Sequence, residues 1–149
     1  MHLDQSLVGH WSSVPFSYGV MEASELGLLG DGRGWSAWFN ADALCVTRLT
    51  WHCPEPGVVE LHATRMVEGT LADGPGSPAF SRVESDQATD EVTRHRFVVG
   101  PVAPAPGAAA VPAVSFDEPV EFCRHYAKGT TRIGPEDDPS RLVLPHPPR

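Results

Sequence analysis

Basic residues are scarce in this chain, and their scarcity excludes several classes of partner. The 149 residues include 11 lysines and arginines against 19 aspartates and glutamates, which gives a net charge of −8. Lys128 is the only lysine, and the arginines are scattered along the sequence. A nucleic-acid backbone or an anionic membrane surface requires clustered basic side chains. We therefore expect neither nucleic acid nor a membrane as a partner.

The chain also lacks the segments that direct a protein into or across a membrane. No apolar run is long enough for a membrane-spanning helix. The first residues are not a charged segment followed by an apolar one, so no secretory signal is visible. These features predict a cytoplasmic protein.

Cysteine occurs only three times, as Cys45, Cys53 and Cys123. An odd number without close pairs is not typical of a disulfide framework or a zinc site. The seven histidines include no His-x-x-x-His spacing. We expect reduced, buried thiols, no metal site and no cofactor.

Three residue types occur only once. Ile133, Asn40 and Lys128 are each the only residue of their type, whereas Ala, Pro, Gly, Arg and Val are abundant. This bias is typical of a GC-rich bacterial genome. The length fits one domain, which can bury a sizeable core without disulfides.

Short apolar stretches separated by turn residues predict an all-β fold. The expected strands cover residues 7–13, 22–29, 35–39, 43–53, 58–68, 80–87, 92–99 and 118–128. Turns are expected at residues 30–34, at 54–57 and at Asp90. Consecutive hairpins favour a single antiparallel up-and-down β-barrel over a sandwich, because a closed barrel leaves no open sheet edge. Asp4 is expected to cap a short N-terminal helical turn.

Two proline-rich segments fall outside this strand pattern. Residues 100–113 form a Pro/Ala/Gly segment that we expect to be a loop outside the barrel ladder, because proline lacks a backbone donor. Residues 135–149 hold five prolines and are expected to form a tail that is draped on the surface or disordered. The barrel domain is therefore predicted to span residues 1–134.

The hairpin around residues 54–57 predicts a strand register. One register brings the apolar faces of both strands together, with the pairs Cys53–Val59, Trp51–Leu61, Leu49–Ala63 and Thr47–Arg65. His52 then meets Glu60 in solvent. A slip by one residue would place Trp51 opposite Glu60, and burial of that face rejects this arrangement.

Gly9, His10 and Trp11 stand at the start of the first expected strand, just after the helical turn. This Gly-x-Trp opening resembles that of the lipocalins and related calycin barrels, and the hairpin at residues 31–34 is similar to small bacterial lipocalin-like proteins. The resemblance implies a closed barrel that holds a small, mostly apolar ligand. It also implies that Trp11 plugs one barrel end beneath an arginine, either Arg124 or Arg132.

The inward faces of the expected strands supply candidate ligand-binding residues. The apolar members of this set are Trp38, Phe39, Leu49, Trp51, Leu61, Phe97 and Phe122. In a small barrel such side chains either fill the core or line a pocket. Two ionisable residues, Arg65 and His95, also face inward in this pattern.

Arg65 and His95 each leave two interpretations open. Arg65 either binds an acidic or enolic group of a ligand or reaches the barrel rim, because a buried guanidinium needs a partner. His95 is either a hydrogen-bonded core residue or a group that polarises or protonates a ligand.

No Ser-His-Asp order or carboxylate pair identifies an enzyme, and no catalytic residue is assigned. We expect the protein to bind a small apolar or amphipathic molecule inside the barrel. The alternative is an enzyme, such as a cyclase, isomerase or hydrolase, that acts on a hydrophobic metabolite in the same cavity. A third option is a filled barrel that acts through its outer surface. A homodimer is compatible with all three.

Overall fold

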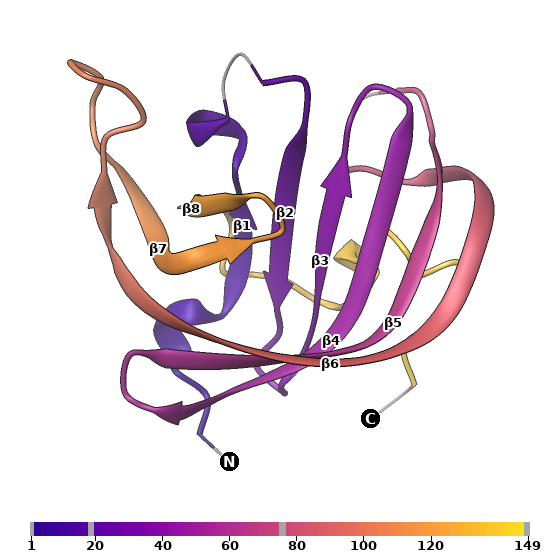
Figure 1. The fold of residues 1–149 in the computed structure, drawn as a ribbon, viewed down its shortest axis with the longest axis horizontal. Helices are drawn as coiled ribbons and strands as arrows, with labels where there is room; N and C mark the ends of the chain where they lie inside the picture. The colour runs from indigo at the N-terminus through magenta and orange to yellow at the C-terminus, as the bar shows by residue number, and fades with distance from the viewer. Residues whose placement is uncertain (1, 18–19, 75–76, 148–149) are drawn as a thin grey trace.

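A computed structural model describes residues 2–17, 20–74 and 77–147 of the chain, which form a closed antiparallel barrel (Figure 1). Within these residues the strands are β1 (Gly9–Ser12), β2 (Ala23–Leu28), β3 (Arg33–Phe39), β4 (Ala43–Glu55), β5 (Val58–Leu71), β6 (Phe80–Val102), β7 (Val111–Val120) and β8 (Cys123–Lys128). Short 3-10 turns are η1 (Gln5–Leu7), η2 (Val14–Phe16) and η3 (Pro135–Asp137). The predicted all-β up-and-down barrel and its N-terminal helical turn are confirmed.

Each strand pairs with its neighbours in the sequence, and the barrel closes where β1 pairs with β8. The closing contact is short, with Trp11 opposite Lys128 and Ser12 opposite Ala127. Figure 1 shows β6 sweeping around the sheet from β5 to β7. None of the described residues forms a helix that is long and apolar enough to cross a bilayer.

The β4–β5 hairpin keeps the predicted register over its apolar half. Trp51 pairs with Leu61, and Leu49 pairs with Ala63. Beyond this point Thr64 is an extra residue in β5, a β-bulge that reverses the alternation of the side chains. Thr47 therefore pairs with Met66, and the predicted Thr47–Arg65 pair is wrong.

β6 is longer than the sequence pattern predicts. The pattern gives strands at residues 80–87 and 92–99 with a turn at Asp90, whereas β6 continues through this position. The β5–β6 ladder shifts register between Ala63 and Arg65, so the sheet accommodates the irregular stretch without ending the strand. The carboxylate of Asp90 lies 2.6 Å from Nε2 of His62 on the neighbouring strand.

The end of the barrel also differs from its prediction in two places. The segment 100–113 is paired at both ends, through Gly100–Ala113, Pro101–Pro112 and Val102–Val111, so only residues 103–110 lie outside the ladder. The expected strand over residues 118–128 is a hairpin instead. β7 ends at Val120, which pairs with Cys123, and Glu121 and Phe122 form the turn between them.

Hydrophobic residues gather on both faces of the barrel wall. The inner cluster fills the end that contains Trp11 and consists of Leu7, Trp11, Leu26, Leu28, Leu49, Trp51, Cys53, Val59, Leu61, Phe97, Val114, Phe116, Val120 and Tyr126. The outer cluster consists of Leu29, Trp35, Ala37, Leu44 and Val46. Trp35 lies over Gly27 on the neighbouring strand, where a Cβ atom would come within 2.2 Å of the ring.

Residues 133–147, which we call the C-terminal strap, cover this outer cluster. Ile133 packs against it, and the ring of His146 lies 6.4 Å from that of Trp35. Asp138 is fully buried and accepts hydrogen bonds from Nε of Arg48, from Nε2 of His146 and from Ser140. Arg48 also donates to the carbonyl oxygen of Leu144. Since a buried carboxylate needs such partners, these bonds fasten the strap to β4.

Trp11 is fully buried at the filled end, and its indole nitrogen donates to the carbonyl oxygen of Leu7 at 2.9 Å. The cation over its ring is Lys128, with Nζ 4.3 Å from the ring centroid and 2.9 Å from the carbonyl oxygen of Val8. The expected arginine is therefore a lysine, because the β1–β8 register places Lys128 opposite Trp11. Arg124 and Arg132 are exposed.

Candidate binding cavity in the barrel

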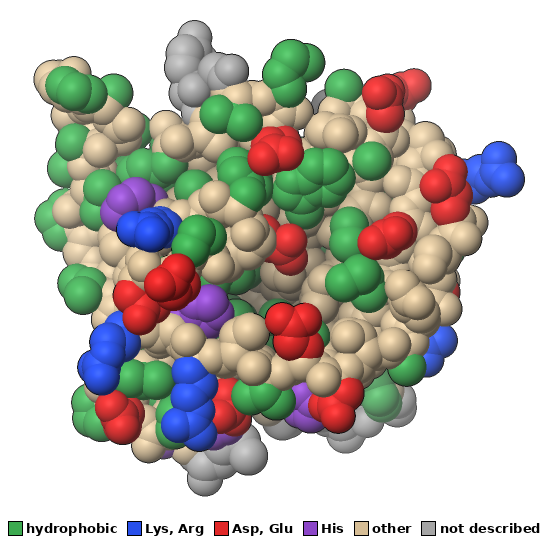
Figure 2. Space-filling model, in the orientation of Figure 1, with side chains coloured by type: hydrophobic (Ala, Val, Ile, Leu, Met, Phe, Trp, Pro, Cys, Tyr) green, Lys and Arg blue, Asp and Glu red, His purple; other side chains and the backbone are tan. Residues whose placement is uncertain are grey.

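A cavity of about 330 Å³ lies inside the barrel above the filled end, between β3 and β7. Its apolar wall consists of Leu49, Leu61, Ala63, Met66 and Val120. Its polar wall includes Ser36, Thr47, Glu91, Thr93, His95 and Glu121. Figure 2 shows this face of the molecule hollowed near its centre, with acidic side chains around the hollow.

Strand alternation and the bulge in β5 together build this wall. Thr47 and Leu49 alternate inward along β4, and Thr93 and His95 do so along β6. The extra residue Thr64 turns the inward series of β5 from Ala63 to Met66. The bulge therefore replaces a charged side chain in the wall with an apolar one.

Glu121 reaches the cavity from the turn between β7 and β8. Its φ angle of 58° lies in the left-handed region, which costs a residue other than glycine on the order of 1–3 kcal/mol. Ser36 on β3 donates a hydrogen bond of 2.6 Å to Oε1 of Glu121. The strained turn thus holds a carboxylate across the opening of the cavity.

A second hollow of about 350 Å³ adjoins the cavity, and we call it the mouth groove. It is lined by Trp38, Ala43, Leu44, Cys45, Glu68, Gly69, Glu84 and Glu121, so it shares Cys45 and Glu121 with the cavity. The indole nitrogen of Trp38 donates to Oε2 of Glu22 at 3.2 Å. Among the described residues, no lysine or arginine lines either space.

The thiol of Cys45 lies between these two spaces. Its Sγ atom is 3.8 Å from Oε1 of Glu68. Burial, followed by the negative charges of Glu121 and Glu68, raises the pKa of Cys45 to about 12. The thiol is therefore protonated at neutral pH and is a poor nucleophile.

His95 is the buried polar group of the cavity wall, with 7% of its surface exposed. Its Nε2 atom lies 3.1 Å from Oγ1 of Thr93, and its ring meets Phe116 edge to face. Nδ1 is buried and has no hydrogen-bond partner among the described residues. This nitrogen has less than 1 Å² of accessible surface, so it does not open into the cavity, and its burial without a partner is costly.

Three of the residues proposed from the sequence line the cavity: Leu49, Leu61 and His95. Trp38 lines the mouth groove. Trp51 and Phe97 belong to the packed inner cluster, where they are 1% and 8% exposed. These two aromatic residues support the cavity from below and do not line it.

The other three proposed residues lie elsewhere. The bulge turns Arg65 outward, where its Nε atom is 2.7 Å from Asp86 and 43% of its side chain is exposed. Phe39 packs against the outer cluster. Phe122 is a half-buried residue of the β7–β8 turn and lines none of the cavities described here. An acidic ligand group therefore has no anchor at Arg65.

Sequence reasoning missed most of the polar wall. Thr93 was accessible to it, because Thr93 and His95 share a face of their strand. Thr47 was assigned to the inner face but not to the site. Ser36 and Glu121 meet only through the β7–β8 turn, and the sequence there contains no glycine or asparagine that signals a tight turn.

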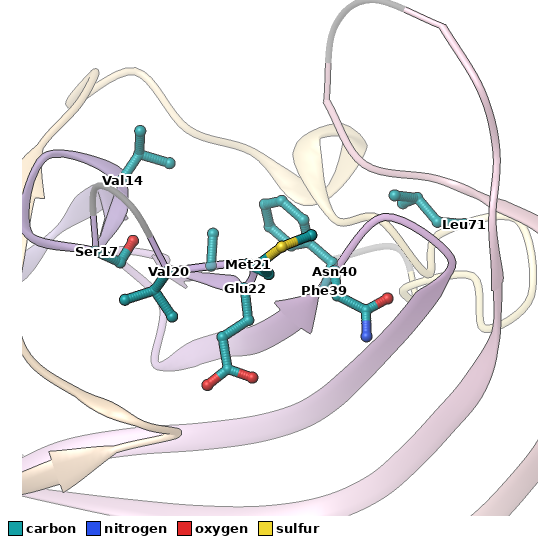
Figure 3. Close-up of a pocket in the computed structure, with 9 residues that line it drawn as sticks. Val14, Ser17, Val20, Met21, Glu22, Phe39, Asn40 and Leu71 are labelled. Carbon is teal, nitrogen blue, oxygen red and sulfur yellow. The ribbon is translucent and has the colours of Figure 1, made fainter.

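Three other hollows are present, and one of about 310 Å³ is lined by Glu55, Val58, Arg94, His95, Arg96 and Asp117. Figure 3 shows a cleft of about 460 Å³ in which Met21 and Phe39 lie together, with Val14 and Val20 on one side and Leu71 on the other. Met21 is 83% exposed.

A groove of about 470 Å³ runs beside Trp11 and Lys128 along the ends of β6 and β7, and its wall residue Val99 is 42% exposed. The barrel cavity combines a buried apolar wall, in which Leu49, Leu61 and Val120 are 6%, 7% and 6% exposed, with a polar side, whereas the groove has only Ser6 and Lys128 as polar lining. The barrel cavity is therefore the best-formed candidate site of the part described.

Within residues 2–17, 20–74 and 77–147, no three histidine, cysteine or acidic side chains are grouped so that they could hold a metal ion. Comparison of the chain with protein-family models, with curated proteins and with solved structures gave no match. The candidate function therefore depends on the geometry of the cavity.

Proposed function

We propose that this protein binds a small amphipathic molecule inside its barrel. The observation that carries the proposal is the composition of the cavity wall: an apolar side from β4 and β5 faces a polar side that includes Thr93, His95 and Glu121. An apolar guest with a few placed polar contacts is the usual occupant of such a site.

The volume sets the size of the guest. About 330 Å³ is at the lower end of the range for ligand pockets, which begins at about 300 Å³. The adjoining mouth groove adds space at the polar end. These dimensions suit a single ring or a short chain with a polar head.

The proposal includes kinship with the lipocalin-like, or calycin, barrels. It is supported by Gly9, His10 and Trp11 at the start of β1 and by the buried position of Trp11, whereas the cation over its ring is Lys128 and not the arginine that the resemblance implies. The eight-strand up-and-down arrangement is consistent with that architecture.

Catalysis in the same cavity has less support. Of the two ionisable residues that were expected to face inward, His95 lines the cavity but Arg65 is on the outer surface. Cys45 holds its proton too firmly to act as a thiolate. Binding is therefore the function that the geometry favours.

The proposal is tested by blocking the cavity. Octanol, a neutral probe, would be titrated calorimetrically into wild-type protein, Ala63→Phe and Thr50→Phe. Ala63 lines the cavity, whereas Thr50 is exposed on the outer face of β4 and provides the matched control. We expect octanol to bind wild type and the Thr50 variant alike and to bind the Ala63 variant about tenfold more weakly or not at all, because a phenyl ring occupies the space. Absence of binding to wild type, or equal binding to all three, would refute the site.

Native mass spectrometry of freshly purified protein provides an independent measurement. We expect the wild-type protein and the Thr50→Phe control to carry an additional small mass that the Ala63→Phe variant lacks. A copurified molecule retained equally by the Ala63 variant would place the binding site outside the cavity.

A further inference from the structure

We propose that two copies of this chain associate through one edge of β6, by antiparallel pairing of residues 86–94 about a two-fold axis at Asp90. This inference goes beyond the proposed function and needs no ligand. It gives the homodimer that the sequence left open a defined surface and a defined register.

One side of β6 is unpaired over most of the length of the strand. β5 pairs with β6 from Phe80 to Arg96, whereas β7 pairs with it only from Phe97 to Val102. Figure 1 shows β6 curving along the lower and right sides of the view, away from β7. Within the described residues, no strand pairs with positions 80–96 on the side opposite β5. Such an edge is a template for another strand, because its backbone donors and acceptors lack a neighbour.

Backbone donors point outward from this edge. Phe97 donates its N–H to a carbonyl oxygen of the β4–β5 turn at 2.9 Å, whereas Arg96 donates its N–H to Oδ1 of Asp117 on the opposite side at 3.0 Å. Because amides alternate along a strand, those of Arg94 and Val92 point the same way as that of Arg96. Asp117 caps Arg96 only, and the described chain offers no strand to the other two amides on that side.

The outward side chains of residues 86–94 complement themselves when the strand is reversed. With the axis at Asp90, Asp86 lies opposite Arg94 of the second copy and Ala88 lies opposite Val92, and each pair occurs twice. Opposite charges and apolar side chains stabilise a strand pair when they face each other. Val92 is 53% exposed in the single chain, so the pairing also removes apolar surface from water.

The charges at this edge continue into β5. Nε of Arg65 lies 2.7 Å from the carboxylate of Asp86, and Nε of Arg94 lies 2.8 Å from that of Glu60. Pairing therefore places four charges in a row across the two copies, two from each, and their signs alternate. A single surface ion pair contributes little, whereas complementary charges across an interface fix its register.

The two neighbouring registers that keep the same faces together lose this match. Moving the axis by one residue toward the N-terminus sets Asp86 opposite Val92, and moving it by one toward the C-terminus sets Ala88 opposite Arg94. Each of these registers places a charge against an apolar side chain. The sequence of the edge therefore favours the axis at Asp90.

The pairing is limited at both ends. β7 occupies the edge of β6 from Phe97 onward. The β5–β6 ladder shifts register between Glu68 and Gly69, opposite Ser85 and Val83, and such an irregularity bends a strand. Because of the two-fold symmetry, this bend in the second copy lies where β7 begins, so the two strands part at that point.

One contact in this register is unfavourable and gives a prediction of its own. Asp90 on the axis meets Asp90 of the second copy, and like charges opposite one another destabilise a strand pair. The neighbouring His62 lies 2.6 Å from this carboxylate in each copy. We expect Asp90→Asn to strengthen the association by about threefold or more, as measured by sedimentation equilibrium. Weaker association of this variant would contradict the position of the axis.

Charge reversal on either side of the Asp86–Arg94 pair tests the interface. Sedimentation equilibrium would compare full-length wild type, Asp86→Arg, Arg94→Asp and an equimolar mixture of the two variants, from about 1 μM to about 1 mM protein. Salt of about 0.15 M screens the net charge of −8 on each copy. We expect wild type to dimerise and each variant to bind itself about tenfold more weakly or not at all, because like charges then face each other twice.

The mixture and two control variants separate this pairing from a general effect of charge. In the mixture, position 86 of one variant faces position 94 of the other with opposite charge, so association should recover. Asp73→Arg and Arg124→Asp make the same changes in net charge at exposed positions outside β6, and we expect both to dimerise like wild type. Circular dichroism would establish that each variant is folded.

A cysteine on the axis tests the register without altering the Asp86–Arg94 pair. In the proposed dimer the two copies of position 90 have Cα atoms about 4.5–5.5 Å apart, which suits a disulfide. We expect Asp90→Cys to form a covalent dimer under mild oxidation. Ala88→Cys is the matched control, because its two copies lie about 14 Å apart along the strand pair. Wild type gives the background from the three native cysteines.

Three results would overturn the inference. Wild type that stays monomeric up to about 1 mM would show that this edge does not associate. A dimer that neither charge reversal weakens, or that the mixture of variants does not restore, uses another surface. Disulfide formation by Ala88→Cys as fast as by Asp90→Cys would exclude the register. None of these results bears on the barrel cavity, whose test uses octanol.

Discussion

Replacing Asp138 with asparagine tests the contact that fastens the C-terminal strap to the barrel. The carboxylate is fully buried and accepts hydrogen bonds from Arg48, His146 and Ser140. Asparagine has nearly the same shape, but its amide group turns a donor toward the donors of Arg48. The change therefore leaves the guanidinium, whose side chain is only 13% exposed, without its counter-charge.

The expected loss in the free energy of unfolding is about 3–5 kcal/mol, the range measured when one partner of a buried ion pair is removed. Arg48→Met provides the comparison, because it replaces the cation with an apolar chain of similar length. In the Arg48→Met protein, Asp138→Asn should lower the free energy of unfolding by less, because no unpaired guanidinium remains. The difference between the two losses measures the coupling between Arg48 and Asp138. Denaturant unfolding followed by tryptophan fluorescence gives these values. A loss below about 1 kcal/mol, or the same loss in both backgrounds, would show that the strap does not depend on this pair.

The remaining predictions concern the strap, the inner cluster and the Trp11 plug. Burial lowers the pKa of His146 in the folded protein, so the unfolded chain binds more protons below pH of about 6.5. The contribution of neutral His146 to the free energy of unfolding is present above that pH and is lost as the pH falls through the pKa of His146 in the folded protein. His146→Gln should therefore flatten the dependence of the free energy of unfolding on pH in this range. An unchanged dependence would contradict the assignment of this effect to His146. Trp51→Ala should cost about 3–5 kcal/mol of unfolding free energy, against under about 1 kcal/mol for Glu60→Ala at the edge of the same hairpin. Comparable losses in denaturant unfolding would refute the register. Lys128→Met should cost about 1–2 kcal/mol by the same measurement, through the lost cation–π contact with Trp11, and no change would remove that contact as a stabilising feature.

The sequence predicted those parts of the barrel that depend on simple alternation. The pairing of Trp51 with Leu61 and Leu49 with Ala63 follows from apolar residues that coincide across a hairpin. Thr64 carries no comparable signal, because a bulge is an extra residue with an ordinary side chain. Because the sequence pattern does not show this bulge, it placed Arg65 on the inner face of β5, whereas Arg65 lies on the outer face.

The same limit applies to the two faces of the wall. Alternation groups Trp35, Ala37 and Phe39 correctly, but it does not say which face lies inside. These residues belong with the outer cluster, which is buried only because the C-terminal strap covers it. The strap is rich in proline and has no apolar period, so its contacts depend on single residues such as Asp138 and His146.

For the same reason the sequence predicted part of the apolar wall of the candidate site and His95, but not the rest of its polar wall. Leu49 and Leu61 lie on regular stretches of strand, whereas Glu121 owes its place to a tight turn that uses a left-handed glutamate. Turn prediction relies on glycine, asparagine, aspartate and proline, so this turn was missed. The negative charge of the opening became apparent only when residues from β3, β5, β6 and the β7–β8 turn were brought together.

A backbone-amide NMR titration tests most directly whether ligands enter the barrel. Isotope-labelled protein would be titrated with octanol. Binding in the barrel predicts saturable shifts at Thr47, Ala63 and Thr93. Shifts confined to Met21 and Leu71 in the outer cleft, or to Ser6 and Ala110 in the groove beside Lys128, would contradict it and move the site to the outer surface.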